Sequence, residues 1–507
     1  MSRQAVTCAG ILTAAGTIGD AVVIEDGKIA RVTWRSELGD LALEEYPGAT
    51  ILPPLIDAHL HPLGYAGLVT GTSLKDATDI DDLVERLAVI DTAGAIIAQR
   101  FDDTTVGRLP TRHDLDRASP DRPILAYRYC GHIAVANTAA LDAAGIGPTT
   151  PDPPGGSLDR DTSGIPTGVL RETAIEMVTV AVDPLVMPPT DAAIVTAMRG
   201  LVATGLSRVV GIAATDKPLW CGVGNELETL CRLATDIPLD IDVVVIADTP
   251  GDLRRAAADI ASAGGRLRFW GWKDFADGSL GGHTAAMWSR FMDEDTAGTL
   301  RLKADHAAEM AGAAFELGGV AAIHAIGDRA IDETLDVFDR LIDAGADPGR
   351  LRIEHLSVAS DDAIHRLSDR GIVASVQPPF LTSEAGWLPG RLGPQRNAYR
   401  FATMEAAGVR LIAGSDCPVE RPDPLTGIAA AVHRSGWDDG ENVAVESAIG
   451  WYTEAPAAHL GLPPTLRPGS PADFVVVQGM VGSPDAEVAA VYRGGVPEEL
   501  NPVEWPG

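Results

Sequence analysis

The stretch LIDAHLHPLGYA, residues 55–66, places two histidines one residue apart directly after an apolar run. If that run is a β-strand, His59 and His61 point to the same side of it, because side chains alternate along a strand. Imidazole is a good ligand for zinc and similar divalent ions. The pair therefore predicts a metal clamp at a strand end, and two plain polar residues in that position are the alternative.

The composition of the 507-residue chain describes a large globular protein with an acidic surface. Hydrophobic residues make up 46% of it, and the formal net charge is −31. Charge of this sign repels nucleic-acid phosphates and anionic lipid, and no apolar run reaches the roughly 20 residues of a membrane span. We therefore expect no nucleic-acid partner and no membrane partner.

The cysteines and the N-terminus bear on the compartment. The chain has five cysteines without CxxC spacing, which argues against a disulfide framework and for a reducing environment. The opening MSRQAVTCAGILTAAG has only a thin basic region, and a strand pair with a DG turn follows at once. We interpret it as a first β-strand rather than a signal peptide and expect a cytoplasmic protein.

Both ends of the chain are rich in strand-like runs. Residues 1–52 and residues 466–507 each contain short apolar runs separated by Gly, Ser and Pro. Because chain termini often lie close together, we expect the two ends to form one small β-sandwich.

Between the ends, over residues 53–465, strand-like runs alternate with helical patterns. Alternation of this kind favours parallel βαβ units, and eight runs favour an α/β fold closed as a (β/α)8 TIM barrel. The runs are ATILPPLIDAH, LSRVVGIAATD, IPLDIDVVVIAD, LRFWGWKDFADG, GGVAAIHAIGD, RLRIEHLS, GIVASVQPPF and GVRLIAGSDCP. The segment between the first two runs is far longer than a crossover needs. It predicts an ordered insertion over about residues 65–200, which we interpret as a lid on the barrel.

Four further potential ligands lie at or near the ends of later runs: Lys273, His324, His355 and Asp416. In a barrel the carboxyl ends of the strands meet at one rim, where active sites lie. Chance could place one or two such residues there. Four of them, in addition to the paired histidines, indicate a metal site.

Lys273 is an unusual residue for a metal site, because an ammonium repels cations. The chain has only five lysines among 40 basic residues, so a lysine within an apolar strand stands out. A neutral lysine can add carbon dioxide to give a carbamate, a carboxylate that is able to bridge two ions. Burial and nearby metal ions favour the neutral amine. The alternative is a salt bridge from Lys273 to Asp274 or Asp277.

Together these motifs resemble the amidohydrolase superfamily, and within it the branch that includes N-substituted formamide deformylase. The matching stretches, in chain order, are LIDAHLHP, GHIAVANTAAL, GIPTGVLRETA, WKDFADGSLGGHTAA, IHAIGDRAID, RIEHLS and GSDCPVERPDP. The resemblance implies a distorted barrel with a small β-sandwich built from both termini. It also implies a metal-dependent hydrolase that acts on carbon–nitrogen bonds other than peptide bonds.

The resemblance further implies a binuclear metal centre, with zinc as the first expectation. The ligands that it implies are His59, His61 and Asp416 for one ion, His324 and His355 for the other, and N6-carboxylated Lys273 as the bridge between them.

The resemblance, with this ligand set, favours hydrolysis of a linear amide, N-formyl or N-acyl bond in a small molecule. A divalent ion lowers the pKa of bound water toward ~7, so a metal-bridged hydroxide is the expected nucleophile. Asp416 is expected to take its proton and pass it to the leaving nitrogen. The alternative on the same scaffold is deamination or cyclic-amide hydrolysis, with one metal or two. A non-catalytic scaffold is a third hypothesis, and the presence of all six ligands weighs against it.

Three residues are candidates for contact with the substrate. His132, in GHIAVAN, is expected to donate to the carbonyl oxygen, and a structural histidine is an equally good alternative. Gln377 ends the seventh strand-like run, and Glu172 either lines the pocket or forms a helical salt bridge. Asp277 and Asp328 would orient ligands or simply occupy turns. A homodimer is one expectation for the assembly.

Overall fold

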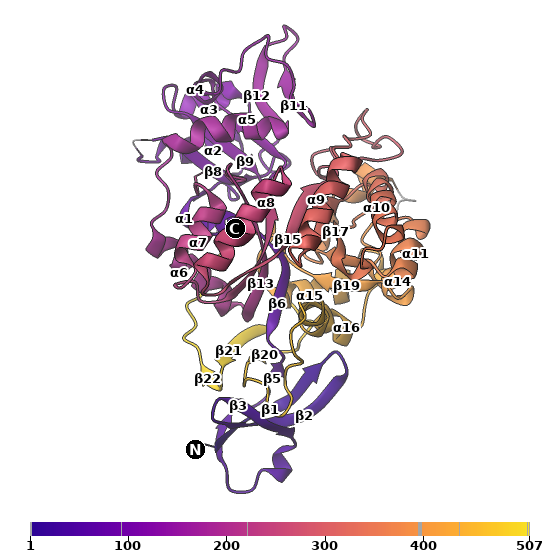
Figure 1. Cartoon of the computed structure of the whole chain (residues 1–507). Helices are drawn as coiled ribbons and strands as arrows, with labels where there is room; N and C mark the ends of the chain where they lie inside the picture. The colour runs from indigo at the N-terminus through magenta and orange to yellow at the C-terminus, as the bar shows by residue number, and fades with distance from the viewer. Residues whose placement is uncertain are drawn as a thin grey trace.

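The computed structural model of the protein describes residues 3–92, 94–220, 222–393, 398–434, 437–503 and 505. Its centre is a parallel sheet of eight strands in the order β19-β18-β17-β16-β15-β14-β13-β6 (Figure 1). The strands are β6 (Leu55–Leu60), β13 (Leu206–Ala214), β14 (Asp240–Ile246), β15 (Leu267–Phe275), β16 (Val320–Ala325), β17 (Leu351–His355), β18 (Val373–Val376) and β19 (Arg410–Ala413).

An isolated parallel bridge joins Leu60 of β6 to Cys417, which follows β19, and so nearly closes the sheet into a barrel. The eight strand-like runs of the sequence are thus the eight barrel strands, and the predicted (β/α)8 fold is confirmed. Parallel strands are covered on both faces, which explains why they read as continuous apolar runs. In β14, for example, Val243, Val244 and Val245 are all buried.

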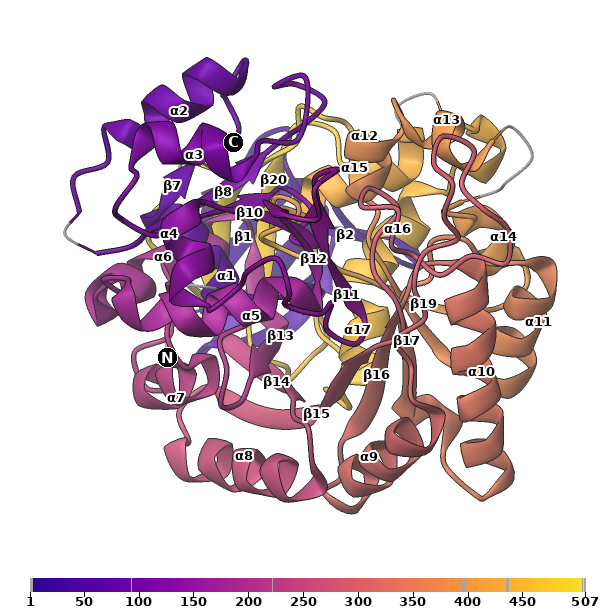
Figure 2. The same cartoon turned by 90° about the horizontal axis from the view of Figure 1, so that it is seen from above.

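Helices pack around the outside of the barrel (Figure 2). They are α7 (Glu226–Leu233), α8 (Pro250–Ala263), α9 (Ala304–Glu316), α10 (Asp328–Asp343), α11 (Asp361–Arg370), α12 (Phe380–Glu384), α13 (Leu388–Leu392), α14 (Phe401–Ala406), α15 (Pro424–His433), α16 (Val445–Tyr452) and α17 (Glu454–His459). Their sequences are amphipathic: α10 buries Ile331, Leu335 and Phe338, which helical spacing places on one face. Among the described residues, no helix has the length and apolar character needed to cross a membrane.

A second sheet combines both ends of the chain and forms the predicted small β-sandwich. Its strands are β1 (Arg3–Thr13), β2 (Gly16–Glu25), β3 (Lys28–Thr33), β4 (Ala42–Glu45), β5 (Thr50–Leu52), β20 (Phe474–Gln478), β21 (Glu487–Arg493) and β22 (Val496–Pro497). Antiparallel pairing of β5 with β20 joins the N-terminal strands to the C-terminal ones. Val22 and Phe474 belong to one apolar cluster and Ala21 to another, because neighbouring residues of β2 point to opposite faces.

The chain between β6 and β13 forms a third sheet, which lies beyond the opposite end of the barrel from the β-sandwich (Figure 1). Its strands are β7 (Thr72–Ser73), β8 (Ile96–Phe101), β9 (Ile124–Arg128), β10 (Ile133–Ala136), β11 (Gly156–Arg160) and β12 (Pro166–Glu172). Its helices are α1 (Pro62–Thr70), α2 (Ile80–Ala88), α3 (Arg112–Ala118), α4 (Thr138–Ala143), α5 (Thr173–Val182) and α6 (Asp191–Ala203). We call this segment the insertion. It has an apolar core of its own that includes Leu83, Phe101 and Leu115. Its exact limits as a domain and its movement as a lid remain predictions.

Candidate active site

The residues predicted as metal ligands gather at the carboxyl end of the barrel. His59 lies near the end of β6, Lys273 and His324 lie in β15 and β16, and His355 is the last residue of β17. Asp416 follows β19. All of them, with His61, are buried. The barrel therefore brings together six side chains that are distant in the sequence.

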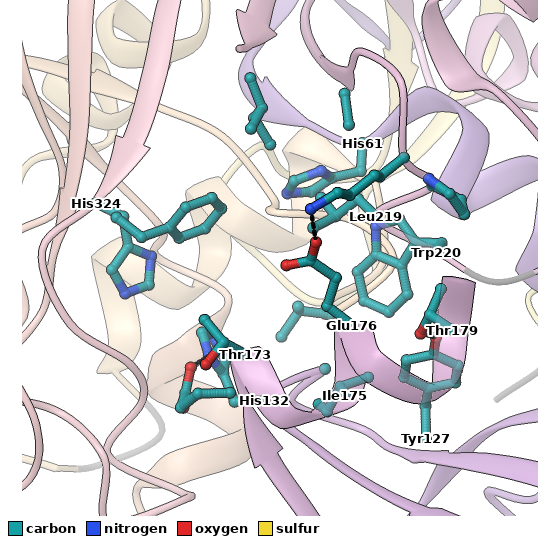
Figure 3. A pocket seen from close by; sticks show the side chains of 18 of the residues that line it. His61, Tyr127, His132, Thr173, Ile175, Glu176, Thr179, Leu219, Trp220 and His324 are labelled. Carbon is teal, nitrogen blue, oxygen red and sulfur yellow. Dashed lines mark hydrogen bonds and ion pairs between the residues drawn. The ribbon is translucent and has the colours of Figure 1, made fainter. Parts of the chain in front are cut away.

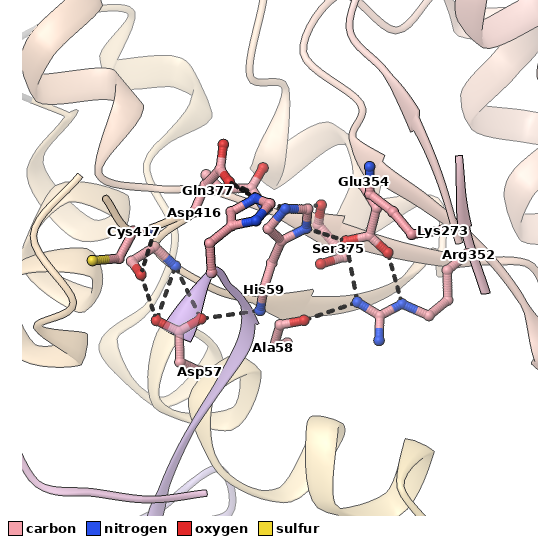
Figure 4. Close-up of polar contacts among 12 residues, drawn as sticks. Asp57, Ala58, His59, Lys273, Arg352, Glu354, Ser375, Gln377, Asp416 and Cys417 are labelled. Atoms are coloured by element: carbon pink, nitrogen blue, oxygen red, sulfur yellow. Dashed lines mark hydrogen bonds and ion pairs between the residues drawn. The ribbon is translucent and has the colours of Figure 1, made fainter. Parts of the chain in front are cut away.

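The tightest group is formed by His59, His61 and Asp416. Their ligand atoms all lie within 4.8 Å of one another, and no other such cluster of three potential ligands occurs in the part of the chain that the structure describes. Asp416 Oδ1 is 3.2 Å from Nε2 of His59 (Figure 4). The same oxygen is 3.2 Å from Nε2 of His61. Three donor atoms at this spacing are able to coordinate one divalent ion.

His324 and His355 continue this group along the rim. The two ring centroids are 4.4 Å apart, and the His355 ring is 4.8 Å from that of His59. His324 Nε2 is 2.9 Å from the carbonyl oxygen of Gly278, so Nδ1 is the nitrogen left for a ligand. The two histidines are therefore placed to offer nitrogen donors beside the first group.

Lys273 is buried beside these ligands, but it is not among the residues that line the cavity above them. Its Nζ lies 3.7 Å from the centroid of the Phe275 ring and donates to the carbonyl oxygen of Asp274 at 3.2 Å. Burial lowers the pKa of Lys273 to about 8, against the opposing effects of Glu354 and Asp416. The neutral amine that carboxylation requires is thus accessible near neutral pH.

Two of the predicted ligands, His324 and His355, are held in the neutral form. Burial lowers the pKa of His355 to about 3, and burial with the neighbouring His355 and Lys273 holds the pKa of His324 well below its usual value. Neutral imidazole is the form that coordinates metals. Among the described residues, the buried Nδ1 atoms of His61 and His355 have no hydrogen-bond partner. Neutral imidazoles, a carboxylate and unpartnered buried nitrogens together fit a divalent metal centre.

Glu354 orients His59, which the sequence analysis did not foresee. Its Oε2 is 2.6 Å from His59 Nδ1, while Arg352 Nε donates to Glu354 Oε1 at 2.8 Å (Figure 4). Burial opposes ionisation of Glu354, but Arg352 and His59 hold its pKa below the usual range. The signal was present in RIEH, because Arg352 and Glu354 lie two residues apart on one side of an otherwise apolar strand. A carboxylate behind a ligand histidine is the usual way to fix its tautomer.

Asp57 holds the first and last barrel strands together beneath the ligands. Its carboxylate accepts hydrogen bonds from the backbone N–H of His59 at 3.0 Å and from Ser415 Oγ at 2.6 Å. Ser415 immediately precedes Asp416 in the chain. This contact therefore fixes the two ligand-bearing segments relative to each other.

A cavity of about 250 Å³ opens above the ligands, between the barrel rim and the insertion (Figure 3). Tyr127 and Ile175 line it from the insertion, and Trp220 lines it from the loop after β13. An ion pair between Lys217 and Glu176 joins that loop to α5 at the edge of the cavity. The walls thus come from two parts of the chain, while the floor is the group of predicted metal ligands.

The loop after β13 is anchored by Glu226, another residue that sequence reasoning missed. Its buried carboxylate accepts hydrogen bonds from the backbone N–H groups of Ala214, Leu219 and Trp220. The Trp220 ring then packs 5.7 Å from Tyr127 and 6.0 Å from His61, measured between ring centroids. Glu226 therefore places the aromatic wall that connects the insertion to the ligands.

The three predicted substrate contacts lie in different surroundings. His132 lines the cavity, and its Nδ1 is 2.9 Å from Oε2 of Glu172. Glu172 also borders the cavity, although its side chain is only 2% exposed. Gln377 is buried, is not among the residues that line this cavity, and donates from Nε2 to the carbonyl oxygen of Ser375 at 3.4 Å. Their roles toward a substrate remain predictions.

The two aspartates considered as orienting groups, Asp277 and Asp328, also make different contacts. Asp277 accepts hydrogen bonds from the backbone N–H groups of Ile326 and Gly327, and its Oδ1 is 3.5 Å from His324 Nε2. Asp328 instead accepts from the backbone N–H of Trp288 at the start of α10. Asp277 therefore supports the segment that follows the predicted ligand His324, and Asp328 joins the loop after β15 to the start of α10.

A parallel barrel whose rim gathers histidines and a carboxylate is typical of enzymes that bind a metal ion. The Amidohydrolase family matches residues 47–497 of the chain, and the chain belongs to that family. The putative amidohydrolase YtcJ of Bacillus subtilis is 30% identical to this chain, and the match covers 91% of this chain and 91% of YtcJ. N-substituted formamide deformylase of Arthrobacter pascens is 26% identical, with 88% of this chain and 86% of its own covered.

A solved structure of similar architecture is that of an uncharacterized metal-dependent hydrolase from Pyrococcus furiosus. It is 28% identical to this chain, with a TM-score of 0.72, and the match covers 95% of this chain and 100% of the other. Fold and family together support hydrolase activity for this protein.

Proposed function

We propose that the protein is a metal-dependent hydrolase that cleaves a carbon–nitrogen bond in a small molecule, namely a linear amide, N-formyl or N-acyl bond. The observation that carries this proposal is the group of His59, His61 and Asp416, with His324 and His355 beside it, at the floor of a cavity. Membership of the amidohydrolase family and the named activity of the Arthrobacter relative also favour it.

The residues would hold two divalent ions, with zinc as the first choice for a site of imidazole and carboxylate donors. His59, His61 and Asp416 would hold one ion, and His324 and His355 the other. Carboxylated Lys273 would join the two. When bound, such ions polarise a carbonyl group and lower the pKa of water.

Asp416 would move the proton. Burial opposes its ionisation, but His59, His61 and His355 hold its pKa well below the usual value, so the carboxylate is ionised at neutral pH. It would accept a proton from the attacking water and donate it to the leaving nitrogen, a transfer that typically contributes ~10²–10⁴-fold to the rate. His132 would contact the acyl oxygen from the insertion side. Trp220 and Tyr127 would exclude bulk water.

Metal analysis followed by an amide screen tests the proposal. The purified protein would be stripped with a chelator, reloaded with zinc, and assayed with N-formyl and N-acyl amines beside cyclic amides and aminopyrimidines. We expect two metal equivalents per chain and release of free amine from linear amides, lost on stripping and restored on reloading. Release of ammonia with one equivalent would indicate a deaminase instead, and no turnover at full occupancy would indicate a scaffold.

The cellular compartment and the oligomeric state are part of the same proposal. Cys8, Cys130, Cys231 and Cys417 are free thiols, which is compatible with the cytoplasm. A homodimer remains our prediction for the assembly, and light scattering of the purified chain would test it.

A further inference from the structure

The carboxylate of Glu172 contacts two basic side chains at the edge of the cavity. Its Oε2 is 2.9 Å from His132 Nδ1 and 3.3 Å from Arg301 Nη1. The Glu172 side chain is 2% exposed, whereas those of His132 and Arg301 are 19% and 22% exposed. The carboxylate is therefore withdrawn from the cavity, and the two groups that it binds are the ones presented there.

The backbone of Glu172 is held in a conformation that a non-glycine residue rarely adopts. Glu172 ends β12 and is the N-cap of α5, with φ of 52° and ψ of −126°. Strained backbone of this kind persists only where the surroundings impose it, and it occurs preferentially at functional sites. Here it turns the chain from β12 into α5 at the point where the side chain meets His132.

Gly278 connects this carboxylate to the metal-ligand region. A Cβ at Gly278 would lie 2.2 Å from Glu172 Oε1, so only glycine leaves room for the carboxylate. The carbonyl oxygen of the same residue lies 2.9 Å from His324 Nε2. The His132 and His324 rings are consequently neighbours, with centroids 5.5 Å apart. Gly278 thus contacts both Glu172, which binds His132 of the insertion, and His324 of the barrel.

Arg301 reaches the same point from the barrel side. It follows β15, lines the cavity, and its Cζ lies 5.4 Å from the centroid of the Phe275 ring. Contact with Phe275 and with Glu172 restrains the guanidinium in two directions. Arg301 therefore ties the Glu172 carboxylate of the insertion to the barrel rim.

We propose that Glu172 is a positioning residue for His132 and that Arg301 is its partner in that role. Because Nδ1 is occupied by Glu172, Nε2 is the nitrogen that His132 offers to a molecule in the cavity. The pair would hold Nε2 at the acyl oxygen of the bound amide, next to His324. This inference rests on the proposed function, and it assigns Glu172 an action through His132 rather than a contact with substrate.

A double-mutant cycle tests whether Glu172 acts through His132. We expect Glu172→Gln to lower kcat about 10- to 100-fold, with a much smaller change in KM and full zinc content. In a His132→Asn background the same substitution should have no further effect, because residues that act as a unit are not additive. Independent, multiplicative losses in the double variant would overturn the proposal.

Two further variants separate positioning from general damage. Asp159→Asn is the matched control: Asp159 Oδ1 accepts from Arg171 Nε at 2.9 Å in the same sheet but does not touch His132. We expect Asp159→Asn to leave kcat unchanged.

Arg301→Lys keeps the positive charge but loses the planar guanidinium group, so it should lower kcat about 10-fold. This variant also provides the test if Glu172→Gln does not fold. An unchanged kcat in Arg301→Lys would remove Arg301 from the role.

A measurement that needs no turnover keeps this inference separate from the proposed function. In ¹⁵N-histidine-labelled, zinc-loaded protein we expect a protected Nδ1 proton for His132, assigned by its absence in His132→Asn and lost in Glu172→Gln. If no amide is cleaved but this signal behaves as expected, the proposed reaction fails and the positioning holds. If amides are cleaved and the signal is the same in both proteins, the positioning fails alone.

Discussion

The floor and the walls of the cavity are built in different ways. On the floor, His59 is 1% exposed and its side chain is held by a carboxylate on another barrel strand. At the edge of the wall, the Lys217 and Glu176 side chains that join the loop after β13 to the insertion are 54% and 43% exposed. Exposed ion pairs contribute little to stability, whereas breaking a buried pair is costly. The difference predicts that substitutions among the buried contacts of the floor cost more stability and activity than substitutions at the exposed edge of the wall.

The strongest test of the floor is Asp416→Asn. An amide cannot accept and return the proton, so we expect kcat to fall by ~10²–10⁴-fold, while the histidine donors retain metal. Metal content by mass spectrometry and turnover of the best amide would be measured on the same sample. Full activity in this variant would exclude Asp416 from proton transfer.

A second test of the floor is Glu354→Gln, which removes the buried charge that Arg352 and His59 share. We expect metal affinity to fall about 10- to 100-fold and the free energy of unfolding to drop by about 3–5 kcal/mol. Zinc titration and chemical denaturation would measure the two effects. Unchanged affinity would show that the floor does not depend on this contact.

The junction between floor and wall should respond to pH through Glu226. Burial raises the pKa of this carboxyl from 4.5 to about 7, so between those values the native state holds a proton that the unfolded chain releases. This contribution to stability is therefore present below about pH 4.5 and is lost as pH rises to 7, by an amount on the order of 3 kcal/mol.

Glu226→Gln removes that proton. The melting temperature of this variant, relative to the wild-type protein, should therefore move in favour of the variant as pH rises from 4.5 to 7. A constant difference across this range would show that Glu226 does not titrate there.

The smallest expected effect concerns the wall alone. Thr179→Val removes the hydrogen bond between Thr179 Oγ1 and Tyr127 Oη, which are 2.9 Å apart. We expect a loss of about 1 kcal/mol of stability and an unchanged metal content, because this hydrogen bond joins two residues of the insertion and involves none of the predicted ligands. A loss of metal in this variant would contradict the separation of wall from floor.

Much of the fold and of the floor could be predicted from the sequence. Parallel strands read as apolar runs, and their carboxyl ends must share a rim, so His324 and Asp416 could be brought together without coordinates. The orienting pair Arg352 and Glu354 was also visible as two charges on one side of a buried strand. The role of Glu226 could not be predicted, because no sequence spacing relates this residue to the backbone N–H groups that donate hydrogen bonds to it.

Local residue patterns were enough to predict the barrel strands, the β-rich ends of the chain and the residues available as ligands, because side-chain periodicity can be read from neighbouring residues. Which carboxylate meets which imidazole follows from the tertiary packing. Glu354 reaches His59 across 295 residues of chain, and Arg301 reaches Glu172 across 129. Such contacts form because packed elements bring distant parts of the chain together, and no local pattern in the sequence reveals them.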